Sequence, residues 1–149
     1  MFDKVKNLFE TLNVPYEVVN FRVNAGGITT LEKVYIGNPQ WYHTEEYMMF
    51  VALHEIGHYK RLQSGKVPDM ELVVKEPFEK FFEIVLKEEK IAERYSEYCY
   101  RKIYGKLPEK SPLENRPEGV ERLYREAYNT FHSFNGTYLE FIHSLIDKN

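Results

Sequence analysis

The sequence is poor in cysteine, in long apolar runs and in clustered basic residues, and each shortage argues against a class of protein. Cys99 is the only cysteine, so a disulfide within the chain is impossible, which suits a reducing cytoplasm. No run of 18 apolar residues is present and Met1–Lys4 lacks the apolar core of a signal peptide, so we expect no membrane span and no membrane partner. The net charge is −3 and basic residues form no long cluster, which argues against nucleic acid as a partner.

Apolar and aromatic residues, by contrast, are plentiful. Of the 149 residues, 43% are hydrophobic and 15% are aromatic, with 12 Tyr and 10 Phe, so a disordered chain is not expected. This length suits one domain with a substantial core, spanning residues 1–149, and is short for two.

The most informative stretch is His54-Glu55-Ile56-Gly57-His58. Residues four apart share one face of an α-helix, so His54 and His58 can direct imidazole nitrogens at one point. Glu55 points toward the rim of that point, where it can take a proton from a metal-bound water. A catalytic zinc site has three protein ligands and an open position, whereas closed structural sites are usually rich in cysteine. The pattern therefore predicts a hydrolase with Zn²⁺ as cofactor and Glu55 as general base.

The residues around this motif have the pattern of a buried helix. From Thr44 to Leu62, apolar residues and the two histidines follow i, i+3, i+4 spacing, and no proline interrupts them. Gly57 lowers helix stability by roughly 1 kcal/mol relative to Ala. Such a glycine is understandable if another element passes close to the metal.

A second long helix is predicted from Pro77 to Tyr104, and Glu89 falls on its inward face. A buried carboxylate needs a cation or full hydrogen bonding, so Glu89 is the best third metal ligand. Glu93, one turn further, could accept the outer N–H of a ligand histidine. Glu88 competes for the third position, but it points about 100° away and is expected in solvent. The inward face consists of Phe78, Phe82, Val85, Ala92, Ser96, Cys99 and Ile103.

The chain before the motif indicates a small antiparallel sheet. Residues 2–13 have the spacing of an amphipathic helix, and residues 16–23 are rich in β-branched and aromatic types, as in a strand. Residues 28–36 form one strand or two short ones. The end of this segment, Lys33–Ile36, is either an edge that pairs with an extended peptide substrate or part of a plain structural hairpin.

The chain after the motif is mainly helical. Residues 63–77 read as a loop with a brief strand at 70–74, and residues 105–119, which carry three prolines, read as another loop. A helical region is expected from Glu118 to Ile146, broken at Asn135-Gly136, with Thr137 capping its last piece. Its predicted packing face consists of Val120, Leu123, Tyr124, Ala127, Phe131 and Phe134.

The two motifs together, His54–His58 and Glu89-Lys90-Ile91-Ala92-Glu93, resemble those of the gluzincin metallopeptidases over roughly residues 28–96. The compact layout is similar to the minigluzincins and, more loosely, to the ImmA/IrrE-like peptidases. The resemblance implies a zincin-like α+β fold, peptide-bond hydrolysis, and a zinc ion held by His54, His58 and Glu89. It also implies Glu55 as the base and Glu93 as the partner of a ligand histidine, although Asp is commoner there.

The resemblance leaves the residue that stabilises the oxyanion unassigned. His132 and His143 also fit the SprT-like zincins, which complete their site with a third histidine, but Glu89 is preferred because it interrupts an apolar stripe. Two other functions fit the motif: a regulatory zincin-fold protein that meets one partner, such as a repressor or a phage–host target, and a zinc-stabilised module without chemistry. The candidates for the oxyanion residue are Tyr95, Tyr98, Tyr100, His132 and His143.

Overall fold

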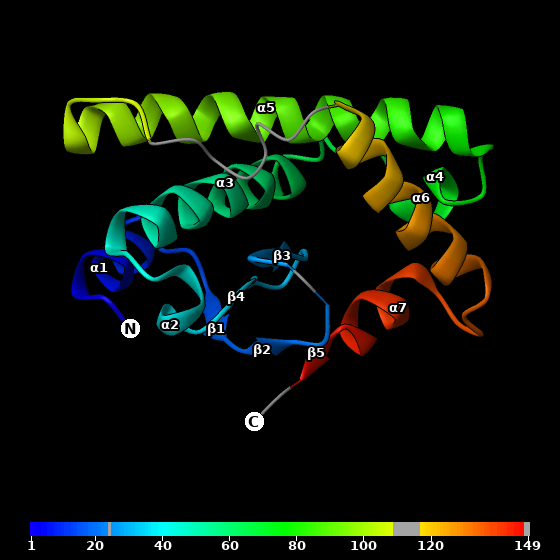
Figure 1. The fold of residues 1–149 in the computed structure, drawn as a ribbon, viewed down its shortest axis with the longest axis horizontal. Helices are drawn as coiled ribbons and strands as arrows, with labels where there is room; N and C mark the ends of the chain where they lie inside the picture. The colour runs from blue at the N-terminus through cyan, green and yellow to red at the C-terminus, as the bar shows by residue number, and fades with distance from the viewer. Residues whose placement is uncertain (24, 109–116, 148–149) are drawn as a thin grey trace.

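Two long helices lie side by side above a small sheet in the computed structural model, which describes residues 1–23, 25–108 and 117–147 (Figure 1). These helices are α3 (Glu45–Gln63) and α5 (Phe78–Tyr104), close to the predicted bounds. α3 lies between α5 and the sheet, so it is buried from two sides. Among the helices of this described part, none combines the length and the apolar character needed to cross a membrane. The fold is of the expected α+β class.

The sheet has three strands, in the order β1 (Tyr16–Val18), β4 (Val34–Ile36) and β3 (Gly27–Thr29). β4 runs parallel to β1 and antiparallel to β3, so the prediction of a purely antiparallel sheet is wrong. The reason is a long-range pairing: after β1 the chain leaves this sheet, and β2 (Asn20–Phe21) pairs with β5 (Ile146–Asp147) near the C-terminus. The single strand predicted in this region is therefore split in two.

β4 is the central strand and buries a side chain on each face. Val34 and Ile36 belong to the main core beneath α3, whereas Tyr35 points to the opposite face and packs with Ile146. Because β1 and β3 cover both sides of β4, Lys33–Ile36 offers no free edge, and the alternative prediction of a structural hairpin is the one found, with β3 as the partner strand. β3 is an outer strand, and it packs against α3.

The remaining N-terminal helices are short. α1 (Asp3–Thr11) matches the predicted amphipathic helix and buries Val5 and Phe9 in the core that it shares with α3. α2 (Pro39–Tyr42) is a single turn that leads into α3, whose first turn is capped by the Thr44 hydroxyl.

α3 and α5 approach each other closely at Gly57. A Cβ atom on Gly57 would lie 3.1 Å from Tyr95 Cδ1 and 3.5 Å from Ala92 Cα, both on α5. One turn further along α5, the buried Ser96 hydroxyl donates to the Phe50 carbonyl of α3 at 2.7 Å. The glycine that weakens the helix locally thus permits the close contact that the sequence suggested.

Residues 70–74 are helical rather than extended, contrary to the predicted brief strand. The Asp69 carboxylate accepts a hydrogen bond from the Glu71 amide and caps α4 (Met70–Val73). This local cap satisfies a donor of the first helical turn and outweighs the strand preference of the valines.

The C-terminal region forms α6 (Pro117–His132) and α7 (Tyr138–Ser144), separated by the predicted break. Thr137 caps α7 as expected, through a reciprocal capping box. Residues 109–116 of the predicted loop lie outside the described part of the chain, and Leu123 of the predicted packing face is exposed. α4, α6, the start of α5 and the start of α7 share a largely aromatic cluster that includes Val73, Val74, Phe78, Phe81, Tyr124, Tyr128, Phe131 and Tyr138.

Candidate metal centre

Two helices bring two imidazoles and a carboxylate to one point. His54 and His58 lie one turn apart on α3, and each directs its Nε2 atom at Glu89 of α5. His54 Nε2 is 2.8 Å from Glu89 Oε2, His58 Nε2 is 3.0 Å from Glu89 Oε1, and the two Nε2 atoms are 3.1 Å apart. The three residues named from the sequence as metal ligands therefore converge.

The spacing of the triangle formed by the donor atoms of His54, His58 and Glu89 fits a metal ion. Donor atoms around a tetrahedral zinc ion, with bonds of about 2.0–2.1 Å, stand about 3.3 Å apart. The observed separations of 2.8 to 3.1 Å need to open by only a few tenths of an ångström. The side chain of His54 is 6% exposed, whereas those of His58 and Glu89 are 16% and 25% exposed, so the group opens to solvent on one side. Such a group could hold a metal and keep a position for water.

The electrostatics of the triangle favour positive charge between the three side chains. Burial lowers the pKa of His58, but the hydrogen bond to Glu89 and its negative charge raise the value to about 9 overall. Burial raises the pKa of Glu89, but its hydrogen bonds to the two imidazoles bring the pKa well below its usual range. A divalent cation bound between these side chains would supply that positive charge.

Glu93 lies on the outer side of His54. Its Oε2 atom is 3.7 Å from His54 Nδ1, and this buried nitrogen has no hydrogen-bond partner among the described residues. The separation is too long for a hydrogen bond. A small movement of Glu93 would nevertheless let it accept the Nδ1–H, which would leave Nε2 as the ligand atom.

Glu55 is buried beside this group and is held by strand β3. The Thr29 hydroxyl is 2.6 Å from Glu55 Oε2 and 3.1 Å from the Glu55 carbonyl oxygen. A Cβ atom on Gly27 would lie only 2.6 Å from Glu55 Cγ, so the strand leaves room for this side chain only because residue 27 is glycine. Neither Gly27 nor Thr29 stands out in the sequence, because the contact joins residues 26 or more positions apart.

Glu88 is not in solvent, which corrects the sequence-based prediction. It is buried, and its carboxylate accepts hydrogen bonds of 2.7 and 2.8 Å from Nε and Nη2 of Arg61 on α3. The predicted inward face of α5 is largely confirmed: Phe78, Ala92 and Ser96 are buried, and Ile103, which is 39% exposed, is the exception. An arginine partner meets the need of this buried carboxylate, so Glu88 is not available as a metal ligand.

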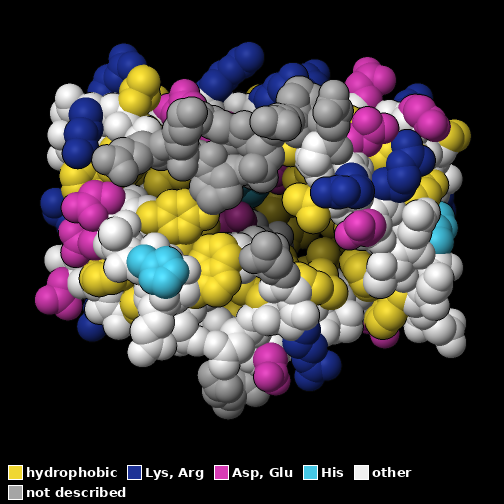
Figure 2. Space-filling view, viewed as in Figure 1, with side chains coloured by type: hydrophobic (Ala, Val, Ile, Leu, Met, Phe, Trp, Pro, Cys, Tyr) yellow, Lys and Arg dark blue, Asp and Glu magenta, His cyan; other side chains and the backbone are white. Residues whose placement is uncertain are grey.

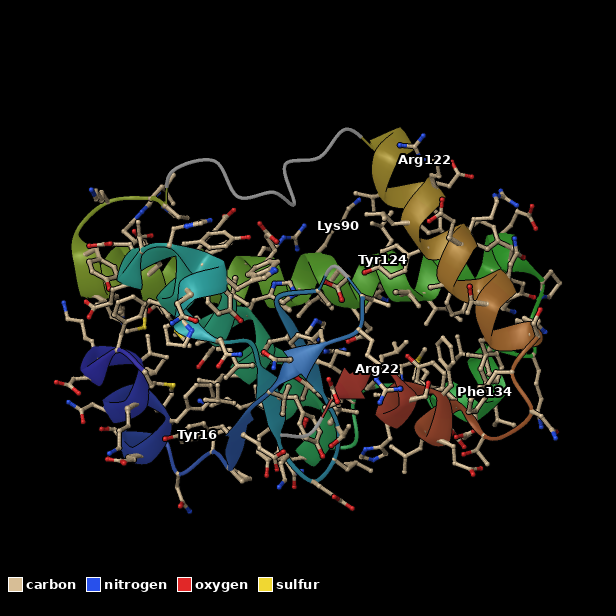
Figure 3. All side chains as sticks on the ribbon, turned by 60° about the horizontal axis from the view of Figure 1, so that its bottom comes forward. Tyr16, Arg22, Lys90, Arg122, Tyr124 and Phe134 are labelled. Carbon is tan, nitrogen blue, oxygen red and sulfur yellow. The ribbon has the colours of Figure 1, made fainter. Side chains whose placement is uncertain are left out.

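Tyr124 of α6 is a site residue that sequence reasoning missed. Figure 3 shows it reaching from α6 toward α5. Burial raises the pKa of Tyr124 well above its usual value, and the charges of Glu89 and Glu55 and a hydrogen bond to Glu89 raise it further. Tyr138 of α7 is also close to this charge, and burial and Glu89 raise its pKa to about 12. In the sequence, Tyr124 is only one of several aromatics on a packing face.

The tyrosines and histidines expected as oxyanion candidates lie in other contacts. Tyr95 packs where Gly57 meets α5, Tyr98 is exposed beneath Lys102, and Tyr100 packs edge-on against Phe50. The ring of His132 is 2.9 Å from the Val74 carbonyl oxygen, and that of His143 packs against Tyr35. Within the described residues, the metal-ligand group consists of His54, His58 and Glu89, without a third histidine.

A hollow marks the middle of the face seen in Figure 2, with hydrophobic side chains around it and acidic atoms at its floor. The same view in Figure 1 places α3, α5 and β3 behind this part of the surface.

Comparisons with protein-family models, with characterised proteins and with solved structures gave no match. The function is therefore inferred from the chemistry of the site.

Proposed function

We propose that the protein is a zinc-dependent metallopeptidase of the gluzincin type. The observation that carries the proposal is the convergence of His54, His58 and Glu89, with the Glu55 carboxylate buried beside them. Two imidazoles and one carboxylate form the donor set of catalytic rather than structural zinc sites. The helix pair packed on a small sheet is compatible with a zincin-like fold.

Zinc held by His54, His58 and Glu89 would lower the pKa of its water to about 7 and polarise the scissile carbonyl. Glu55 accepts the proton of the attacking water and then passes it to the departing amine. Glu55 thus acts first as the proton acceptor and then as the proton donor. Its burial limits the access of other water molecules to the carboxylate.

Tyr124 is the residue that we propose for stabilising the developing oxyanion. Its raised pKa keeps the hydroxyl protonated through the neutral range, and it lies within hydrogen-bonding reach of Glu89. From there the hydroxyl could donate to the carbonyl oxygen of a bound peptide as negative charge develops on it.

Strand β3 offers a place for an extended peptide or protein substrate. Ile28 forms the hydrogen-bonded pair with Tyr35 of β4, so the backbone groups of Gly27 and Thr29 face away from β4. A substrate strand could pair with these two residues, beside Glu55. We also propose a cytoplasmic location, because the chain's one cysteine suits a reducing compartment.

The test is cleavage of casein and of a mixed peptide library by the zinc-loaded protein, compared with its Glu55→Gln variant. The variant should retain one zinc per chain and lose hydrolysis, because Glu55 is not a ligand. Unchanged hydrolysis by the variant would overturn the mechanism. Zinc binding without cleavage by the wild-type protein would instead favour a protein that meets a single partner.

A further inference from the structure

We propose that Thr29 is a positioning residue for Glu55: its hydroxyl holds one carboxylate oxygen, which directs the other toward the reacting water. This inference rests on the proposed peptidase function and assigns a role to strand β3 within it. The proposed role concerns the orientation of the base. The Thr29 hydroxyl contacts Glu55, which is not a metal ligand.

The two distances at the Thr29 hydroxyl decide where its proton lies. The oxygen is 2.6 Å from Glu55 Oε2 and 3.1 Å from the Glu55 carbonyl oxygen. A hydroxyl has one proton, and O–H···O⁻ bonds to a carboxylate are typically about 2.5–2.7 Å long. The hydroxyl therefore donates to the carboxylate. Among the described residues, Thr29 is the hydrogen-bond donor to this carboxylate.

Gly27 supplies the space in which the carboxylate is held. Gly27 and Thr29 are two positions apart on a strand, so they face the same side, toward Glu55. A Cβ atom on Gly27 would lie 2.6 Å from Glu55 Cγ, 3.0 Å from Cδ and 3.1 Å from Oε1. Gly27 thus leaves room for the side chain, and Thr29 sets the rotation of the carboxylate about its last bond.

A general base needs this restraint because its side chain rotates about three bonds. In the proposed mechanism, one carboxylate oxygen of Glu55 accepts the proton of the water. A displacement of that oxygen by about 1 Å can lower the rate on the order of 100-fold. Supporting hydrogen bonds of this kind are worth about 10- to 100-fold in activity when removed. The hydroxyl of Thr29, rather than its bulk, should therefore carry the effect.

The test compares Thr29→Val, which removes the hydroxyl and keeps the shape, with Thr29→Ser, which keeps the hydroxyl. We expect Thr29→Val to lower kcat by about 10- to 100-fold with little change in KM or zinc content, and Thr29→Ser to retain most of the wild-type kcat. Thr30→Val is the matched control: Thr30 is also buried, but its hydroxyl contacts the Lys33 backbone, so its loss should lower stability and leave kcat unchanged.

A second variant tests whether Gly27 is needed to leave room for the Glu55 side chain. Gly27→Ala should displace Glu55 and lower kcat, again with zinc retained. In the metal-free wild-type protein, NMR should detect the Thr29 hydroxyl proton in slow exchange with water, and the signal should be absent from Thr29→Val. Rapid exchange of that proton would overturn the inference without any assay of hydrolysis.

The outcomes separate the inference from the function on which it rests. If wild-type protein cleaves peptides and Thr29→Val keeps its kcat, positioning by Thr29 is wrong and the peptidase proposal stands. Equal losses in Thr29→Ser and Thr29→Val would also overturn it, because the hydroxyl would then not matter. If zinc-loaded wild-type protein cleaves nothing, the peptidase function fails first, and the role of Thr29 in that reaction falls with it.

Discussion

Glu88 and Glu89 are neighbours on α5, and we predict opposite consequences for the two substitutions Glu88→Gln and Glu89→Gln. Glu89 faces the two imidazoles of α3, whereas Glu88 faces Arg61. Replacing either carboxylate by an amide changes the size of the side chain little and removes one negative charge. Glu89→Gln should therefore weaken zinc binding, and Glu88→Gln should lower stability with zinc binding retained.

The structure sets the expected magnitudes. Removing a partner from a fully buried ion pair costs about 3–5 kcal/mol, whereas an exposed pair is worth about 0–1 kcal/mol. The side chains of Glu88 and Arg61 are 11% and 23% exposed, and a glutamine can still accept one hydrogen bond, so we expect about 2 kcal/mol for Glu88→Gln. For a domain of this size, that is a decrease in Tm of about 4–8 °C. Loss of the anionic ligand in Glu89→Gln should reduce zinc affinity by at least about 100-fold, more than a supporting residue contributes.

Two assays read these effects separately. Competitive titration with a zinc-sensitive chelating dye gives the affinity, and calorimetric unfolding of the metal-free variants gives the stability. The double variant Arg61→Met/Glu88→Gln should recover part of the loss, because no unpaired charge of the ion pair then remains. The reasoning is refuted if Glu88→Gln loses zinc while Glu89→Gln keeps it, since α5 would then present the other glutamate to the metal.

Three further results are expected. Tyr124→Phe should lower kcat by about 100-fold with zinc content unchanged, because the hydroxyl but not the ring is removed; steady-state kinetics and metal analysis check this, and an unaltered kcat would remove Tyr124 from the mechanism. Gly57→Val should cost about 1–3 kcal/mol and weaken zinc binding, because its methyl groups would push α5 away from α3; denaturant unfolding of the variant, with and without zinc, measures both effects. Zinc at about 1,000 times its Kd should raise the free energy of unfolding by about 4 kcal/mol, and His58→Ala should abolish the gain; an equal gain in that variant would show that zinc binds elsewhere.

Features set by neighbouring residues were predictable from the sequence. The spacing of His54 and His58 and the absence of proline were enough for the first helix, because helical contacts join residues three or four apart. The same holds for the extent of α5 and for the Thr137 cap of α7. Glu89 was selected correctly as a residue near both histidines, and of the residues predicted on the inward face of α5 only Ile103 is exposed.

Only the tertiary structure decided which distant residues meet. The parallel pairing of β4 with β1, the partner of Glu88, the hydroxyl that holds Glu55 and the approach of Tyr124 all join positions far apart in the chain. Such contacts depend on how whole helices and strands pack together, and no local periodicity records that. The sequence alone determines which side chains share a turn of helix. The packing of α3, α5, α6 and β3 determines which of these side chains share a site.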